Sequence, residues 1–201
     1  MDVAAIVRLI EQHLADRAVF IGGVAVECYV PYRTTHDIDV VTRERDFPTL
    51  KAALLNASFA HRETHLAKHT FKSPAVGEVD AYTSRIGDVP VDEDLMRRAR
   101  KLVYAKIPVS VASLEDLLRL KLRAGREMDL TDVAVLLHAR RNEVSVTLAE
   151  RLVGRDLLRT HAPRVSELLP EEYGWQARRV LKAWLIEVGW LVPRRKGASA
   201  Q

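Results

Sequence analysis

The sequence of 201 residues has a single cysteine, Cys28, and no long apolar run. One cysteine excludes an internal disulfide and any zinc site built from several cysteines. Even the apolar stretch from Ala18 to Val30 is interrupted by Glu27, and a membrane helix needs roughly 18 apolar residues. The first residues mix charged and apolar positions, unlike the continuous apolar segment of a signal peptide. We therefore expect a cytoplasmic protein with no membrane partner.

Charge is unevenly distributed along a chain of otherwise ordinary composition. Hydrophobic residues make up 48% and charged residues 29% of the sequence, which is typical of a globular protein. Residues 1–100 have a net charge of −2 and residues 101–201 a net charge of +6. The basic half is either a set of solvated helix faces or a surface that meets a polyanion such as nucleic acid.

Apolar periodicity and capping residues predict a mixed α+β fold. Helices are predicted over 3–14, 24–29, 46–55, 91–101, 114–124, 133–140, 148–159, 163–169 and 172–188. Strands are predicted over 19–21, 37–41, 69–72, 78–83 and 107–111, the last at a sheet edge because it contains Pro108. Asp129 and Asp132 are interpreted as capping residues. We expect a small mixed sheet flanked by helices over residues 1–112, with a helical region over 113–201 packed on or beside it.

Three aspartates and two glycines are the candidate chemical residues. Gly22 and Gly23 follow a buried strand, and a second short strand carries Asp37 and Asp39. Alternate strand residues share one face, so these two carboxylates, roughly 6 to 7 Å apart at Cα, can converge on Mg²⁺. Asp80 lies in a later strand, where aspartate is disfavoured. It is either a third carboxylate of the same site or an edge residue facing water.

This set of residues resembles the nucleotidyltransferase superfamily that includes DNA polymerase beta, whose signature is two small residues followed by Asp-x-Asp. The chain is most similar to AbiEii-type toxins and related nucleotidyltransferase-like proteins, which carry a segment like residues 113–132 after the aspartate pair. The resemblance covers about residues 15–140, and residues 141–201 match no motif.

The resemblance implies a Mg²⁺-dependent transfer of a nucleotide from a nucleoside triphosphate to a hydroxyl group. It implies two metal ions held by Asp37, Asp39 and Asp80, with Asp80 closest to the acceptor hydroxyl as its candidate base. Gly22 and Gly23 would let backbone N–H groups approach the triphosphate.

The remaining expectations concern the phosphates, the acceptor and the partners. Lys121 and Arg126 would face the phosphates, although each could equally be a surface charge. The resemblance implies tRNA or another RNA as acceptor and an antitoxin protein as partner. A protein or antibiotic-type small-molecule acceptor, and a binding or regulatory module with weak or no catalysis, remain alternatives.

Overall fold

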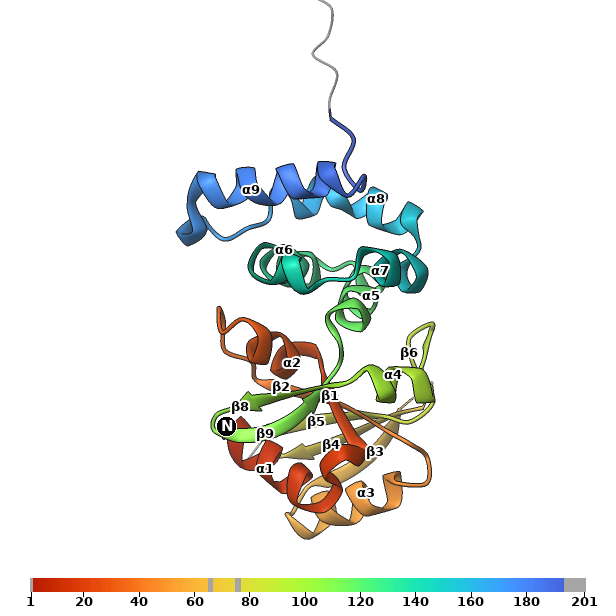
Figure 1. The fold of residues 1–201 in the computed structure, drawn as a ribbon. Coiled ribbons are helices and arrows are strands. Elements are labelled where there is room, and N and C mark those ends of the chain that lie inside the picture. Colours follow the sequence, from red (N-terminus) through yellow and green to blue (C-terminus); the bar gives the residue numbers. More distant parts are fainter. Residues whose placement is uncertain (1, 65–66, 75–76, 194–201) are drawn as a thin grey trace, which may run out of the picture.

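The protein is a mixed β-sheet with helices on both faces and further layers of helices stacked beyond one face (Figure 1). The computed structural model describes residues 2–64, 67–74 and 77–193. This architecture confirms the predicted α+β class with a helical C-terminal region. No helix in these described ranges combines the length and the hydropathy needed to cross a bilayer.

The sheet is built mainly from the first half of the chain. The strands are β1 Ala18–Ile21, β2 Asp37–Thr42, β3 Ala60–Thr64, β4 Lys68–Ser73, β5 Gly77–Tyr82, β6 Arg85–Ile86, β7 Val89–Pro90, β8 Arg100–Tyr104 and β9 Ile107–Val111. Within the described residues, seven of them form one sheet in the order β3-β4-β5-β2-β1-β9-β8. Strand β2 runs antiparallel to β1 and parallel to β5, so the strand that carries the aspartate pair is central.

The helices occur throughout the chain, and those that follow β9 form the helical region. They are α1 Val3–Leu14, α2 Gly22–Tyr29, α3 Phe47–Asn56, α4 Glu93–Arg98, α5 Leu114–Ala124, α6 Glu127–Arg140, α7 Val146–Val153, α8 Arg155–Val165 and α9 Gly174–Glu187, with short 3₁₀ turns η1 Ala15–Arg17, η2 Arg141–Glu143 and η3 Glu171–Tyr173. Helices α1 and α3 lie below the sheet in Figure 1, whereas α5 to α9 stack above it.

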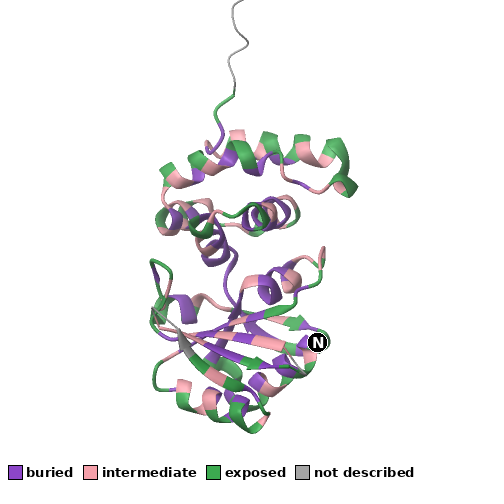
Figure 2. Cartoon of the chain, turned by 180° about the vertical axis from the view of Figure 1, so that it is seen from behind, coloured by how far each residue is buried: buried purple, intermediate pink, exposed green. Residues whose placement is uncertain are grey.

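Two apolar clusters hold these layers together. One joins the sheet to the helices on its faces, and the other fills the space between α5, α6, α7, α8 and α9. Buried residues line the inner faces of the helical layers in Figure 2, and exposed residues line their outer faces. Val30, Tyr32 and Val144 pack against both clusters. The boundary at residues 112/113 stays a prediction.

Several predicted elements have different limits. The helix predicted over 91–101 ends at Arg98, because the chain extends into β8 after it. The helix predicted over 148–159 is divided at Gly154, whose φ of +93° is incompatible with a continuing helix. Helix α6 begins at Glu127 rather than at residue 133.

The predicted edge position of β9 is wrong, because β9 lies between β1 and β8. Pro108 is opposite Val103 in the hairpin with β8, and β1 pairs with β9 only at Phe20 and Val111. The proline therefore lies beyond the end of the β1 pairing, where its missing N–H interrupts no ladder.

Candidate active site

Strands β2 and β5 bring the three predicted aspartates to one face of the sheet. Their parallel register places Asp39 opposite Asp80, and Asp37 opposite Glu78. Residues opposite one another on neighbouring strands share a face, as do residues two apart on one strand. Asp37, Asp39 and Asp80 therefore lie together, as the alternation of the sequence predicts for the first two.

Asp39 lies between the other two aspartates in electrostatic terms, since the charges of both Asp80 and Asp37 raise its pKa. Burial, and next the charge of Asp80, raise the pKa of the Asp39 carboxyl group to about 6, against the opposing charges of Lys121 and Lys68. The Tyr82 hydroxyl donates to Asp39 Oδ1 over 3.4 Å. A partly buried carboxylate beside a second carboxylate favours a bound cation, so the donor set fits a hard cation such as Mg²⁺.

The two glycines make room for the side chains of Asp39 and of Thr35. Gly22 has a φ of +60°, and a Cβ built on it would lie 2.1 Å from Asp39 Oδ2. A Cβ on Gly23 would lie 2.1 Å from Thr35 Oγ1, the hydroxyl that donates to the Asp37 carbonyl oxygen over 3.0 Å. Helix α2 begins at Gly22 itself, so its free N–H groups start directly beside Asp39.

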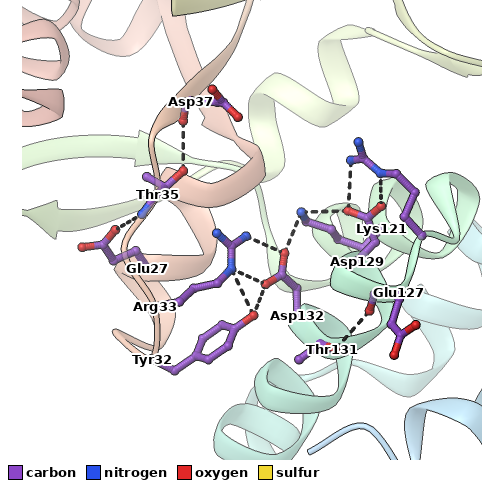
Figure 3. Close-up of polar contacts among 11 residues, drawn as sticks. Glu27, Tyr32, Arg33, Thr35, Asp37, Lys121, Glu127, Asp129, Thr131 and Asp132 are labelled. Carbon is purple, nitrogen blue, oxygen red and sulfur yellow. Dashed lines mark hydrogen bonds and ion pairs between the residues drawn. The ribbon is translucent and has the colours of Figure 1, made fainter. Parts of the chain in front are cut away.

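The other two aspartates differ in how they are compensated. Thr70 Oγ1 donates to Asp80 Oδ1 over 2.6 Å, and Lys68 Nζ lies 2.5 Å from Asp80 Oδ2. Asp37 is exposed, and none of the described side chains hydrogen-bonds or pairs with its carboxylate, which points away from its neighbours in Figure 3. In residues 2–64, 67–74 and 77–193, no three His, Cys, Asp or Glu side chains form a ready-made metal cluster.

Lys121 and Arg126 both form ion pairs with Asp129, but their side chains differ in exposure to solvent. The Lys121 side chain is 10% exposed, and its Nζ lies 3.1 Å from Asp129 Oδ1 and 2.7 Å from Asp132 Oδ2. The Arg126 side chain is 79% exposed, and its Nε donates to Asp129 Oδ2 over 2.6 Å. Lys121 is thus an internal cation with two carboxylate partners, whereas Arg126 presents much of its guanidinium to solvent.

The interpretation of Asp129 and Asp132 as caps is wrong. Helix α6 starts at Glu127, so both aspartates lie inside it, and neither of them caps its N-terminus. The Asp132 side chain is fully buried and accepts from Arg33 Nε and Nη2, each over 2.9 Å, and from the Tyr32 hydroxyl (Figure 3). Asp132 therefore joins the loop ahead of β2 to Lys121 on α5.

The pKa values of these two aspartates follow from that network. Burial by itself would raise the pKa of Asp132, but the hydrogen bonds from Arg33 and the charge of Lys121 lower it below its usual value. Burial acts in the same way on Asp129, and the hydrogen bond from Arg126 with the charge of Lys121 lowers its pKa. Both carboxylates are therefore held in the ionised form.

The network also reaches the aspartates of the sheet. The charge of Lys121 opposes the rise in the pKa of Asp39. The pKa of Arg126 is raised, first by its hydrogen bond to Asp129 and in part by the charge of Asp39. Lys121 and Arg126 are therefore close enough to Asp39 for their charges and its own to influence one another.

Sequence reasoning missed the β4 residues of the site. Lys68 and Thr70 lie on the same face of β4, because the antiparallel register places Thr70 opposite Asp80 and Lys68 two residues along. Their alternation with His69 is visible in the sequence. Only the register between β4 and β5, which the sequence does not specify, could have shown that they face Asp80.

Comparisons with known proteins give one family and several distant folds. No curated protein matches the sequence. Among solved structures, the antibiotic-resistance factor ANT(2'')-Ia is 16% identical, with a TM-score of 0.47 over 93% of this chain and 94% of its own. The lincosamide antibiotic adenylyltransferase LnuA is 15% identical, with a TM-score of 0.49 over 65% of this chain and 91% of its own. A tRNA nucleotidyltransferase has a TM-score of 0.37 at 15% identity, over 86% of this chain and 56% of its own.

The family comparison covers most of the chain and carries the assignment. The family described as nucleotidyl transferase AbiEii toxin, type IV toxin–antitoxin system, matches residues 4–183. That range contains both glycines, all three aspartates of the sheet and the Lys121 network. The chain therefore belongs to the AbiEii family and is a nucleotidyltransferase.

Proposed function

We propose that this nucleotidyltransferase transfers a nucleotide from a nucleoside triphosphate to a hydroxyl group of an RNA, with tRNA as the leading candidate. We further propose that the reaction depends on Mg²⁺ and occurs in the cytoplasm. The observation that carries the proposal is the register that sets Asp39 beside Asp80, directly next to the Gly22 turn.

The triphosphate would bind at the start of α2. The first N–H groups of a helix have no partner within it, and a Gly22 without a side chain allows phosphate oxygens to approach them. Arg126 adds an exposed guanidinium on which the charge of Asp39 acts. Lys121, which is paired with two carboxylates, would act by fixing Asp129 and through it Arg126.

Asp37 and Asp39 would hold Mg²⁺, because one carboxylate is unpaired among the described side chains and the other is crowded by negative charge. When bound, the ion supplies the positive charge that in-line transfer needs on the attacking and leaving oxygens.

Asp80 would take the proton of the acceptor hydroxyl on its carboxylate. The acceptor oxygen then forms a bond to the α-phosphorus, the bond from that phosphorus to the bridging oxygen breaks, and pyrophosphate leaves. The hydrogen bond from Thr70 and the ion pair with Lys68 hold the Asp80 carboxylate in place for this step.

The RNA acceptor rests on charge and on family membership. Residues 101–201 carry a net charge of +6, which favours a polyanionic acceptor. The family belongs to a type IV toxin–antitoxin system, and we propose that this chain is the toxin of such a pair, acting beside an antitoxin protein.

The experiment is incubation of the purified chain with Mg²⁺ and each α-labelled nucleoside triphosphate, with and without total tRNA. Asp39→Ala tests the site. Asp88→Ala is the matched control, because Asp88 has an exposed side chain whose ion-pair partner, Arg123, is also partly exposed. We expect label on tRNA from one nucleotide, lost in Asp39→Ala and kept in Asp88→Ala.

Two other results have definite meanings. Label that appears only when protein or small hydroxyl compounds are supplied would refute the RNA acceptor and keep the transfer reaction. Label on tRNA that survives Asp39→Ala would refute the assignment of the reaction to this face of the sheet.

A further inference from the structure

Lys68 is a cation fixed directly against one of the three aspartates. Its Nζ lies 2.5 Å from Asp80 Oδ2, and its side chain is 34% exposed. The antiparallel pairing of β4 with β5 determines this contact. Its register places Lys68 and Thr70 on the same face of the sheet as Asp80. The position of the ammonium group is therefore set by the pairing of two strands rather than by a loop.

The carboxylates of the three aspartates consequently differ in the contacts that they already make. Both oxygens of Asp80 are engaged, Oδ1 by the Thr70 hydroxyl and Oδ2 by Lys68. The Asp37 carboxylate has no partner among the described side chains, and Asp39 receives only the 3.4 Å contact from Tyr82. A cation is thus in direct contact with Asp80, whereas none of the described cations contacts the carboxylate of Asp37 or Asp39.

We propose that the Lys68 ammonium takes the place of one of the two metal ions, so that the site holds a single divalent cation, at Asp37 and Asp39. The inference rests on the proposed function and lowers the ion count from the two that the family resemblance implies. An ammonium is a compact point charge with three donors, so it can neutralise Asp80 and still direct a donor toward the acceptor or the phosphates.

No other lysine that the structure describes near this face can play the same part. Lys121 is engaged by Asp129 and Asp132 on the helical side. Lys72 projects from the same face of β4, but its Nζ pairs with Glu78 Oε2 over 2.6 Å, and its side chain is 62% exposed. Lys72 therefore provides a matched control on the same strand, with an ion pair of the same type away from Asp80.

The test counts bound ions without measuring turnover. The full chain is dialysed to equilibrium against Mn²⁺ and a non-hydrolysable nucleoside triphosphate analogue present in both chambers, and the excess Mn²⁺ per chain is determined. We expect one ion for the wild type, one for Lys72→Met and two for Lys68→Met, because Asp80 without its lysine can take an ion. Circular dichroism checks that each variant is folded, and Lys68→Gln replaces Lys68→Met if the latter is not.

Each outcome decides the inference separately from the proposed function. Two ions in the wild type would overturn the inference and leave a two-ion transferase in place. One ion in both the wild type and the folded Lys68 variant would show that Lys68 excludes no ion, which also overturns it. No excess Mn²⁺ in the wild type would overturn the inference together with the metal dependence of the proposed function.

Discussion

Gly22 and Asp39 are in such close contact that a single added carbon would collide with the carboxylate: a Cβ at position 22 would lie 2.1 Å from Asp39 Oδ2. Gly22→Ala should therefore displace Asp39. We expect transferase activity and Mn²⁺ affinity to fall at least about tenfold, which corresponds to ~1.4 kcal/mol. Labelled transfer and equilibrium dialysis measure the two effects.

Gly87→Ala is the control for backbone strain. Gly87 has the same φ of +60°, and a Cβ at this position would meet no described atom within 4 Å beyond its chain neighbours. Both substitutions should cost about 1 to 2 kcal/mol of unfolding free energy from the left-handed backbone alone. Equal loss of activity in the two variants would contradict a specific contact between Gly22 and Asp39.

Lys121 and Arg126 should separate into a residue needed for folding and a residue needed for binding. Lys121→Met leaves Asp129 and Asp132 without their shared cation, and breaking a buried ion pair costs about 3 to 5 kcal/mol. Arg126→Met removes an exposed side chain and should cost less than about 1 kcal/mol. Urea unfolding measures both changes.

Kinetics distinguishes the same two variants. Arg126→Met should raise the KM for the nucleoside triphosphate with little change in folding, because the exposed guanidinium is the group proposed to meet phosphate. An unchanged KM in Arg126→Met would contradict the assignment of Arg126 to the nucleotide site. A Lys121→Met protein as stable as the wild type would contradict the internal role of Lys121.

The ion pairs of Asp132 with Arg33 and Lys121 predict that the free energy of unfolding depends on pH. The folded-state pKa of Asp132 lies below its usual value, so its stabilising effect is complete above the unfolded pKa of about 4 and is lost as the pH falls through the folded value. The stability difference between the wild type and Asp132→Asn should be constant above about pH 5 and shrink below about pH 4. Urea unfolding across the acidic range up to neutral pH measures it, and a difference that grows on acidification would contradict the network.

Leu185 tests whether the two apolar clusters unfold together. Its side chain is 1% exposed in the helical cluster, so Leu185→Ala should cost about 2 to 5 kcal/mol. Val30, Tyr32 and Val144 connect the clusters, and hydrogen exchange of β2 amides should therefore accelerate as much as that of α6 amides. Acceleration confined to the helices would instead support independent units divided at residues 112/113.

Local sequence patterns predicted the parts of the site that depend on one strand or one turn. Asp37 and Asp39 share a face because strand residues alternate, and the glycine pair marks a close backbone approach. Asp80 is a candidate because aspartate is unfavourable inside a strand, although that argument alone also allows an edge residue facing water. The same reasoning located most of the helices and the strands β1, β2, β4, β5 and β9.

Residues that depend on register or on helix docking could not be predicted in this way. Lys68 faces Asp80 only because β4 and β5 pair in one particular register. Asp132 has the sequence context of a cap, as does Ser113, whose hydroxyl does cap α5. The difference is that α6 starts at Glu127, two residues after the left-handed Gly125 that ends α5, so that Asp132 lies inside the helix and pairs with Arg33.

The most direct test of the account is a crystal structure of the chain with Mg²⁺ and a non-hydrolysable nucleoside triphosphate analogue. The account predicts the triphosphate at the start of α2, beside Gly22, with its α-phosphate toward Asp39 and Asp80. A nucleotide bound elsewhere, for example in the cavity of about 460 Å³ lined by Tyr29, Arg100 and Glu115, would contradict it.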